Sequence, residues 1–272
     1  MRDGETALRR AGIDSARHDA QRLLAHALRV SWGDLWMRLR EPIDRESHDD
    51  LQEVVRRRCE GEPLGYILGS VVFCGIEIGC GPGVLVPRPE TETLVEVGLG
   101  LIADRPAPLV VDIGTGTGAV AIAIAEARSD VHVVATDISE EALSYATPNA
   151  GRARVTITVA RGDLFDAVDP ALRGRIDLVV SNPPYIPDAA VLPPDVAAEP
   201  PAALRGGQRG DELLRRIVDG SFDALVPDGA LAMEVGTPSQ ARALEAGMLD
   251  GFSAVGVRDD HTDRPRVVWG RR

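Results

Sequence analysis

The sequence predicts an α/β protein with a doubly wound, mostly parallel sheet and a small all-helical region ahead of it. Three observations lead to this fold class. Apolar residues recur at helical spacing up to about residue 62, short β-type runs broken by glycines follow, and strand-like segments alternate with helix-like ones from about residue 108. A chain of 272 residues is long enough for one large domain and a second, smaller one.

Residues 1–65 are predicted to form a helical domain. Three residues of the type that caps helix N-termini, Ser15, Ser31 and Asp44, each precede apolar residues at 3.6-residue spacing. We expect Gly61 to stop the third helix and Pro63 to end helical character. The apolar residues of these three helices are Ala20, Leu23, Leu24, Ala27 and Leu28 in the first, Leu35, Trp36 and Leu39 in the second, and Leu51, Val54 and Val55 in the third.

Residues 66–86 are predicted to form a β-hairpin connector, because the β-rich runs VVF and IEI are separated and followed by glycines. Residues 87–272 are predicted to form the α/β domain, since strands alternate with helices there. The expected strands are LVVDIG, VHVVATDI, VTITVARGDLF, IDLVVSNPP, GALAMEVG, SAVGVRDD and RPRVVWGRR, and the clearest helices are AVAIAIAEA and EEALSYATPNA.

Composition excludes several classes of protein. Hydrophobic residues make up 44% of the chain and charged residues 26%, and no segment reaches the roughly 18 apolar residues that a membrane span needs. The first residues, MRDGETALRRAGID, are charged and lack an apolar core, so we expect no signal peptide, no membrane anchor and a cytoplasmic location. Cys59, Cys74 and Cys80 are odd in number and lack CxxC spacing, which predicts free thiols and no metal site.

The charge of the chain disfavours nucleic acid as a stable partner. Formal net charge is −12, and the acidity lies mainly in the larger part: residues 1–75 carry 12 arginines against 13 acids, whereas the remainder carries 18 against 29. Non-specific affinity for nucleic acid comes mainly from neutralising phosphates, which an acidic surface repels.

A glycine-rich loop predicts a ligand site at the end of the first strand of the α/β domain. Residues 112–118, DIGTGTG, run from this strand into an apolar helix. Glycines there allow positive φ and let a ligand approach the backbone, and the helix N-terminus favours a negative group. The loop also satisfies the dinucleotide template GxGxxG/A, so by itself it does not identify the cofactor.

Two acidic residues follow at the ends of the next two strands. Asp137 ends the second strand, where a carboxylate can accept both ribose hydroxyls of an adenosine, and Ser139 is free to cap the following helix. Asp163 follows the third strand, where an adenine amino group would lie, although a solvated loop acid is an equal alternative for this residue.

The deciding motif is Asn182-Pro183-Pro184-Tyr185, at the end of the fourth strand. The prolines have no N–H groups and hold the turn extended and stiff, so it presents mainly acceptors. An NH2 group could donate to the Asn182 side-chain oxygen and the Pro183 carbonyl while Tyr185 stacks on its plane. The lone pair of an amide nitrogen is delocalised, so the nitrogen is a poor nucleophile. Holding it in line with a reactive methyl group is therefore the main contribution that the protein must make.

These motifs resemble those of a known family, the release-factor glutamine N5-methyltransferases, which are close to DNA adenine amino-methyltransferases with the [ND]PPY signature. The resemblance spans nearly the whole chain. It is carried by VVDIGTGTG, ATDIS and NPPYIP, by DAQRLLAHAL and GEPLGYILG in the N-terminal part, and by GVLVPRPETETLVE, which is similar to the hallmark segment of that family.

The resemblance implies a Rossmann-like, seven-stranded class I methyltransferase domain that uses S-adenosylmethionine and releases S-adenosylhomocysteine. It implies class 1 peptide chain release factors as protein substrates, methylated on the glutamine of their Gly-Gly-Gln motif, and an N-terminal domain that helps to bind them; we expect a monomer. The positions expected to bind the cofactor are Gly114, Thr115, Gly116, Thr117, Gly118, Asp137, Asp163, Leu164 and Asn182. Those expected to act in catalysis are Asn182, Pro183 and Tyr185, and those expected to bind the substrate are Arg88, Glu92, Asn182, Pro183, Pro184 and Tyr185.

The chain departs from the family pattern in two places. Leu164 stands where relatives often have an aromatic residue, with Phe165 next, so adenine stacking is expected to be rearranged. The segment AAEPPAALRGGQRGDELL is similar to a family loop with GG-x-DGL but is lengthened, and its Gly206-Gly207-Gln208 is the tripeptide that a release factor presents.

Other functions share parts of these motifs. The same chemistry could act on a nucleobase amino group or a small-molecule amide, because the Asn-Pro-Pro-Tyr turn recognises little more than a planar NH2. A non-catalytic binding module could retain the fold, and a dinucleotide oxidoreductase could use the glycine loop but has no use for Asn182-Pro183-Pro184.

Overall fold

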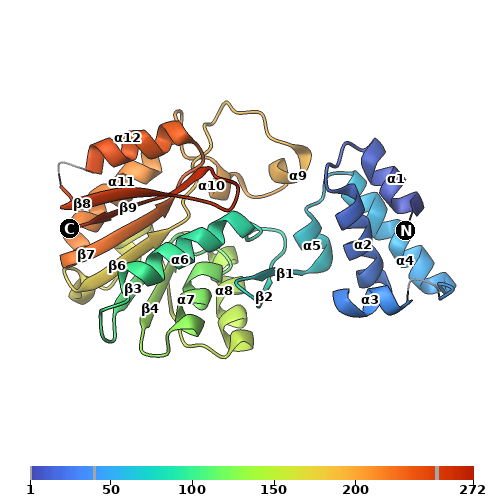
Figure 1. The fold of residues 1–272 in the computed structure, drawn as a ribbon, viewed down its shortest axis with the longest axis horizontal. Coiled ribbons are helices and arrows are strands. Elements are labelled where there is room, and N and C mark those ends of the chain that lie inside the picture. Colours follow the sequence, from blue (N-terminus) through green and yellow to red (C-terminus); the bar gives the residue numbers. More distant parts are fainter. Residues whose placement is uncertain (1, 39–40, 249–250) are drawn as a thin grey trace. The chain divides into compact units, whose positions relative to one another are not determined.

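The structure, a computed structural model, describes residues 2–38, 41–248 and 251–272 (Figure 1). It divides into two compact units, Met1–Ser70 with Leu192–Glu199 and Val71–Val191 with Pro200–Arg272. Among the described residues, none of the helices has both the length and the apolar surface needed to cross a membrane.

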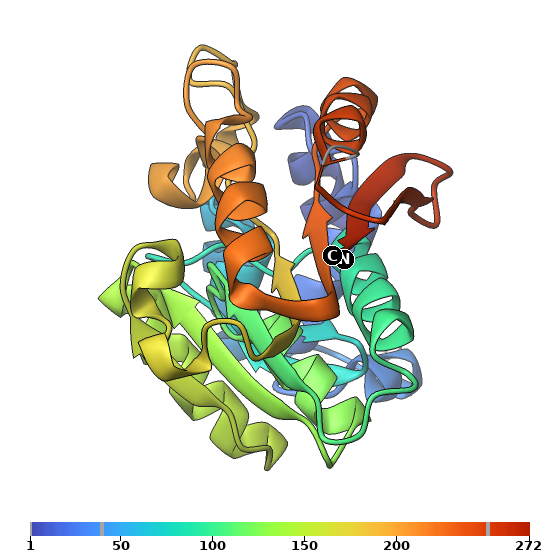
Figure 2. The same ribbon diagram turned by 90° about the vertical axis from the view of Figure 1, so that its left-hand side faces the viewer.

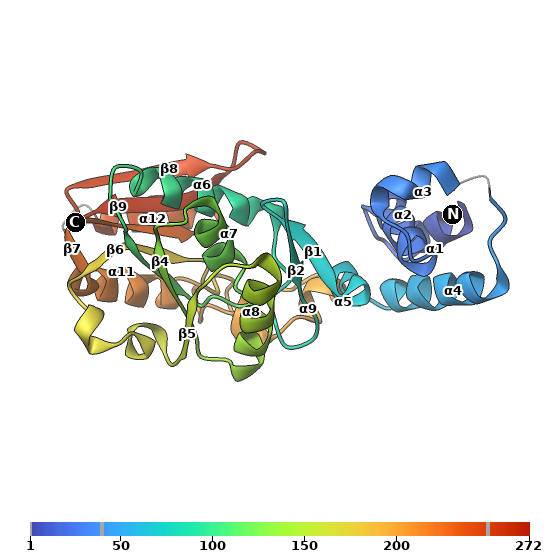
Figure 3. The same ribbon diagram turned by 90° about the horizontal axis from the view of Figure 1, so that it is seen from below.

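The smaller unit is a helical bundle. Its helices α1, α2 and α4 pack against one another around a core that includes Leu8, Leu23 and Val54. Figure 3 shows α4 running alongside the group formed by α1, α2 and α3. The helices are α1 (Arg2–Arg10), α2 (Ala16–Ala27), α3 (Trp32–Arg38), α4 (Arg45–Cys59), α5 (Leu64–Leu68) and α9 (Pro194–Ala197).

Two of the three predicted helix caps make the expected hydrogen bonds. Asp44 accepts from the Ser47 N–H at 2.8 Å and Ser31 accepts from the Asp34 N–H at 3.1 Å. Ser15 precedes α2, but its side chain makes no cap hydrogen bond. Leu35, predicted to face the interior, is fully buried, whereas Trp36, predicted to lie on the same apolar face, is half exposed. The predicted residue Leu39 lies outside the described residues.

The expectation that helical character ends at Pro63 was wrong. Pro63 is the N-cap of α5, which continues to Leu68 and ends at Gly69 in the left-handed region. Proline lacks the N–H that the first helical turn leaves without a partner and its φ suits a helix start, so it begins a helix as readily as it stops one.

A buried ion pair explains why Leu192–Glu199 groups with the helical unit, although this segment lies between two sheet strands in the sequence. Arg58 of α4 is buried and donates through Nε to Asp19 Oδ2 at 2.8 Å and through Nη2 to Asp195 Oδ2 at 3.2 Å. A buried guanidinium needs such partners, because losing one leaves an uncompensated charge.

The larger unit opens with the predicted hairpin, shorter than the 66–86 span. Its strands are β1 (Ser70–Phe73) and β2 (Ile76–Gly79), joined through Cys74 and Gly75, which both have positive φ. Residues 66–68 belong to α5 instead. All three cysteines of the chain are free thiols in the structure.

Seven strands form the central sheet in the order β5-β4-β3-β6-β7-β9-β8. The first five of this order pair in parallel, and β9 pairs antiparallel with both β7 and β8. The strands are β3 (Leu109–Ile113), β4 (His132–Asp137), β5 (Thr158–Arg161), β6 (Ile176–Ser181), β7 (Leu225–Glu234), β8 (Ala254–Asp259) and β9 (Pro265–Arg271).

Helices cover both faces of this sheet, as Figure 2 shows. Side chains alternate between two cores: Val110 and Leu178 join a cluster with α6 and α7, whereas Val111 and Val179 join one with α11 and α12. The helices of this unit are α6 (Glu92–Leu101), α7 (Ala119–Ala127), α8 (Glu140–Ala153), α10 (Pro201–Leu204), α11 (Glu212–Ala224) and α12 (Pro238–Met248), with short 3₁₀ turns at Pro89–Thr91, Leu164–Ala167 and Pro170–Leu172.

The buried side chain of Asn149 joins the hairpin to the glycine loop. From α8 it accepts from the Gly79 N–H at 2.9 Å, and its amide donates to the carbonyls of Gly79 and Thr117, each at 2.9 Å. Asn149 is 0% exposed, so water cannot replace these bonds.

We expect Asn149→Leu to lower the free energy of unfolding by about 3 kcal/mol, because it leaves one donor and two acceptors buried without partners. Equilibrium unfolding in urea measures this. Thr147→Leu, at an exposed position of the same helix, is the matched control and should change the value by no more than about 0.5 kcal/mol. Equal effects of the two substitutions would contradict the role given to Asn149.

Candidate active site

The parallel strands of the larger unit end at a cavity of about 540 Å³. Strand ends at one edge of an open α/β sheet are the usual place for a ligand, and the volume suits a cofactor-sized molecule. The sequence-predicted residues that line it are Gly114, Thr115, Gly116, Thr117, Asp137, Asp163, Leu164, Asn182 and Pro184.

The glycine loop folds back on the neighbouring strand. The N–H groups of Gly114 and Thr115 both donate to the Thr136 carbonyl at 2.8 Å. Gly116 has φ of 56°, and a Cβ there would come no nearer than 3.7 Å to another residue, so the chain stays open on its cavity side. The loop therefore presents backbone to the cavity with little side-chain bulk.

Asp137 at the end of β4 is tied to this loop. Its Oδ2 accepts from the Gly116 N–H and its Oδ1 from the Ser139 N–H, each at 2.9 Å. Ser139 also caps α8 through Ala142, as predicted. Burial raises the pKa of Asp137, and backbone hydrogen bonds, foremost that from Ser139, oppose the rise. Each carboxylate oxygen keeps a lone pair that can accept from a hydroxyl.

Asp112, a fully buried acid, ends the loop on the strand side. Its Oδ2 accepts from the Thr115 hydroxyl at 2.6 Å. Burial raises the pKa of Asp112 to about 7, although the Thr115 hydrogen bond opposes the rise. The Asp112 carboxyl therefore loses its proton near neutral pH. A cation beside it would favour the ionised form and lower the pKa.

Asp163 and Leu164 form the next part of the wall. Asp163 pairs with Arg216 of α11 at 2.7 Å, so it is a tethered acid on the cavity wall. Leu164 has φ of 50°, a strained value for a leucine. This backbone places Leu164 on the cavity wall while Phe165 turns into the core under α11.

The Asn-Pro-Pro-Tyr turn follows β6 and borders the cavity. Asn182 donates through Nδ2 to Thr91 Oγ1 at 3.0 Å, so its Oδ1 is left as the acceptor. Thr91 also lines the cavity and comes from the PRPETE segment. This bond joins two motifs that are 91 positions apart in the sequence.

Tyr185 is held by the far end of β7. Its hydroxyl donates to Glu234 Oε1 at 3.2 Å, and its carbonyl accepts from Gln240 Nε2 at 2.8 Å. Its ring packs so close to Gly236 that a Cβ there would lie 2.5 Å away, which requires glycine. Burial and the Glu234 charge raise the pKa of Tyr185, so the phenol stays protonated and donates.

Several predicted site residues do not line the cavity. Glu92 accepts from the Cys74 N–H at 2.8 Å and so joins the PRPETE segment to the hairpin turn. Gly118 instead lets α7 pack near Ala146 of α8. The predicted residues outside the lining are Arg88, Glu92, Gly118, Pro183 and Tyr185.

The polar residues that sequence reasoning missed include Thr91 and Arg216, which line the cavity, and Glu234, which holds Tyr185. Thr91 belongs to the PRPETE segment, from which Arg88 and Glu92 were predicted instead, whereas Arg216 and Glu234 come from segments that carried no recognised motif. The only available signal for Glu234 was an acid at the end of an otherwise apolar strand, GALAMEVG.

The lengthened loop packs onto the chain that follows the Asn-Pro-Pro-Tyr turn. Arg205 donates to the carbonyls of Pro187 and Ala190 at 2.8 and 2.9 Å, and Gly207 O accepts from the Asp188 N–H at 2.9 Å. Gln208 is exposed and does not line the cavity. The loop thus supports the turn and also contributes Pro200, Ala202, Ala203, Arg205 and Leu213 to the cavity wall.

Family comparisons match both parts of the chain. The PrmC N-terminal domain matches residues 1–69, and the methyltransferase small domain matches residues 99–199. The chain is 41% identical over 264 residues to the release factor glutamine methyltransferase of Mycolicibacterium smegmatis, covering 96% of this chain and 92% of that protein. It is 37% identical over 267 residues to the protein of the same name from Deinococcus radiodurans, covering 97% and 94%.

Solved structures share the fold of the larger unit. A methyltransferase from Pyrococcus furiosus aligns with a TM-score of 0.55 and 22% identity, over 72% of this chain and 89% of that one. The T. thermophilus 16S rRNA N2 G1207 methyltransferase, solved with AdoMet and guanosine, aligns with a TM-score of 0.57 and 18% identity, over 75% and 49%. With the seven-stranded sheet, these likenesses confirm the predicted fold class.

Proposed function

Because the chain belongs to the release factor glutamine methyltransferase family, we propose that it transfers a methyl group from S-adenosylmethionine to the side-chain amide nitrogen, N5, of the Gly-Gly-Gln glutamine of class 1 release factors. The observation that supports this most directly is the position of Asn182. It borders a cofactor-sized cavity with its amide oxygen left as an acceptor.

The cavity residues fit S-adenosylmethionine. Asp137 offers two acceptor oxygens for ribose hydroxyls, and Ile138 and Leu164 supply apolar surface for a base. Asp112 can balance a positive charge, and Gly116 leaves the loop open. When bound, the cofactor supplies a methyl group activated by a sulfonium.

The chain itself orients the acceptor nitrogen. An amide NH2 that donates to Asn182 Oδ1 has its nitrogen fixed relative to the cavity, and the two prolines keep this acceptor from moving. The Pro183 carbonyl is the second acceptor that we propose, although Pro183 itself lies outside the cavity lining. Holding reactants in this way is worth about 7 to 11 kcal/mol of the barrier. The glutamine nitrogen loses its proton to solvent after the methyl group has been transferred.

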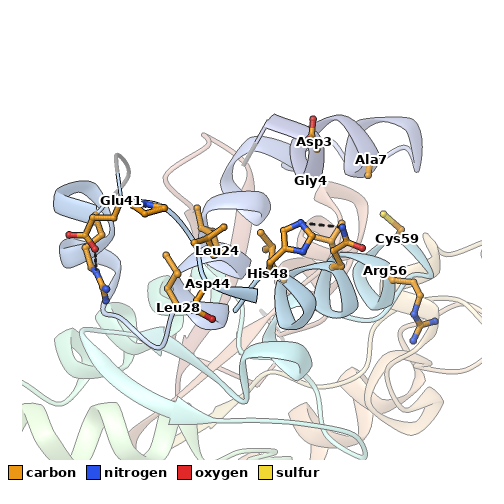
Figure 4. Close-up of a pocket in the computed structure, with 16 residues that line it drawn as sticks. Asp3, Gly4, Ala7, Leu24, Leu28, Glu41, Asp44, His48, Arg56 and Cys59 are labelled. Carbon is orange, nitrogen blue, oxygen red and sulfur yellow. Dashed lines mark hydrogen bonds and ion pairs between the residues drawn. The ribbon is translucent and has the colours of Figure 1, made fainter. Parts of the chain in front are cut away.

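The helical unit is proposed to recognise the release factor. It contains a groove of about 970 Å³ between α1, α2 and α4, lined by apolar and charged side chains (Figure 4). Trp36 and Met37 of α3 are 50% and 75% exposed, which leaves large apolar surface for a protein partner. We propose that residues 1–65 serve recognition and residues 87–272 methyl transfer. The hairpin that was predicted over residues 66–86 is confined to Ser70–Gly79, since residues 66–68 belong to α5.

We further propose that the enzyme acts as a monomer in the cytoplasm, without a stable nucleic-acid partner. The net charge of −12 disfavours phosphate backbones, and release factors themselves work in the cytoplasm.

The direct test of function is to incubate the protein with labelled S-adenosylmethionine and unmodified release factor and map the methyl group by tandem mass spectrometry. We expect the label on the glutamine of Gly-Gly-Gln and none on a factor with Glu at that position. Cofactor binding without label on that glutamine would mean another amide or amino acceptor. Label on Gln208 would reveal self-methylation.

Asn182→Ala should leave the Kd for S-adenosylmethionine within about threefold of wild type while lowering kcat by about a hundredfold or more, since one oriented polar group is lost. Isothermal titration and steady-state kinetics measure the two effects. Asp137→Ala is the matched comparison and should weaken the cofactor instead. Equal loss of cofactor affinity in both variants would contradict the assignment of Asn182 to the acceptor.

Affinity for S-adenosylmethionine should rise with pH through the range around 7. Below its raised pKa of about 7 Asp112 is neutral, and above it the carboxylate attracts a cation. The ionised fraction grows about tenfold between pH 6 and 8, which sets the largest expected change in Kd. S-adenosylhomocysteine, which lacks the sulfonium charge, should respond less, and Asp112→Asn should show a flat profile; an unchanged slope in this variant would exclude Asp112 as the cause.

A further inference from the structure

We propose that Glu234 is a positioning residue that decides which end of the Asn182 amide faces the acceptor, acting through Thr91. This inference rests on the proposed role of Asn182. Glu234 ends β7, which pairs in parallel with β6, and Met233 is the register partner of Ser181. Glu234, the last residue of β7, therefore lies one register position beyond the Met233–Ser181 pair, level with Asn182, which follows β6.

A short relay of hydrogen bonds joins the two residues. Asn182 Nδ2 donates to Thr91 Oγ1 at 3.0 Å, and the Thr91 hydroxyl lies next to the Glu234 carboxyl, whose pKa it lowers against the effect of burial. A threonine hydroxyl has one hydrogen. When Glu234 takes that hydrogen, Thr91 can only accept from Asn182, so the NH2 end of the amide turns to Thr91 and Oδ1 is left for the acceptor.

Glu234 is suited to accept a hydrogen bond because few donors surround its carboxylate. It is 1% exposed, and its Oε2 has no hydrogen-bond partner in the part of the chain that the structure describes. Oε1 accepts from Tyr185, and Arg266 lies 3.9 Å from the same oxygen. Burial raises the pKa of Glu234, whereas the Thr91 hydroxyl and the Arg266 charge oppose the rise and favour the carboxylate. A buried carboxyl with spare lone pairs orients the neighbouring hydroxyls towards itself.

The same carboxyl holds both ends of the Asn-Pro-Pro-Tyr turn. It anchors Tyr185 directly and Asn182 through Thr91. The consequence is chemical selectivity. With Oδ1 exposed, Asn182 accepts from the NH2 of glutamine; with the amide reversed, two donors would face each other and the acceptor hydrogen bond would be lost.

A pair of threonine variants separates this relay from general packing. Thr91→Val removes the hydroxyl that links Asn182 to Glu234. Thr93→Val makes the same change at another buried threonine, two residues away, whose Oγ1 has no partner within the described ranges. We expect kcat/KM for the release factor to fall about tenfold to a hundredfold in Thr91→Val, with the Kd for S-adenosylmethionine unchanged, and to stay near wild type in Thr93→Val.

Glu234→Gln tests the acid itself. A carboxylate accepts at both oxygens, whereas glutamine accepts at one and donates at the other. We expect the same selective loss of kcat/KM as in Thr91→Val, with the unfolding midpoint in urea close to that of wild type. A loss confined to cofactor binding or to stability would overturn the proposal.

Nuclear magnetic resonance reports on the Asn182 side-chain amide independently of enzyme activity. The chain has only two asparagines, Asn149 and Asn182, so ¹⁵N-asparagine labelling gives two side-chain NH2 signals. Asn182→Ala assigns them. We expect Thr91→Val and Glu234→Gln to shift the Asn182 signals and to speed hydrogen exchange there about tenfold, while those of Asn149 stay in place as an internal reference.

The two readouts distinguish failure of the inference from failure of the proposed function. If the wild-type protein methylates no release factor but the Asn182 signals respond to Glu234→Gln, the relay stands and the acceptor is a different NH2 group. If Asn182 signals and kcat/KM are both unchanged in Thr91→Val and Glu234→Gln, the proposal is wrong. An equal effect of Thr93→Val would also refute it, since packing alone would then explain the loss.

Discussion

The parallel pairing of β3, β4, β6 and β7 is the constraint on which the site depends. Parallel strands end at the same edge of a sheet, so the glycine loop, Asp137, Asn182 and Glu234 meet there although they come from separate parts of the sequence. Within the strands, alternate side chains fill two apolar cores. The polar residues of the candidate site lie at the carboxyl ends of these strands or just beyond them: Asp137 and Glu234 are the last residues of β4 and β7, and Asn182 follows β6.

Burying acids at this edge is costly unless each acid has donors. Asp137 has two backbone N–H groups and Asp112 has the Thr115 hydroxyl, whereas Glu234 has one oxygen without a partner among the described residues. The first two acids border the cavity, so a cation or a hydroxyl can complete their surroundings. Glu234 lies behind the Asn-Pro-Pro-Tyr turn, where the donors around its carboxylate are Thr91, Tyr185 and Arg266.

Sequence reasoning predicted the parts of the fold and site that depend on local patterns. Short apolar, β-rich runs that alternate with helix-like segments predicted the strands, and glycines, an acid and prolines at strand ends predicted the positions of the loop, Asp137 and Asn182. It did not predict contacts between distant segments: Thr91 with Asn182, Arg216 with Asp163, or Asp195 with Arg58. It also missed α5 and α6, because a proline next to an apolar run stops or starts a helix and only packing decides which.

The division of the site between strand pairs explains how one sheet edge can serve two ligands. The ends of β3 and β4 carry acids and open backbone, which suit a cationic nucleoside, whereas the ends of β6 and β7 carry a rigid turn of acceptors and the acid that holds it. Asn182 stands between the two halves, on the cavity wall but hydrogen-bonded away from it. An amide nitrogen needs a fixed direction more than it needs a base, so rigidity at this boundary is the catalytic contribution that the fold can make. Proline, buried hydrogen bonds and the close contact of Tyr185 with Gly236 all serve that rigidity.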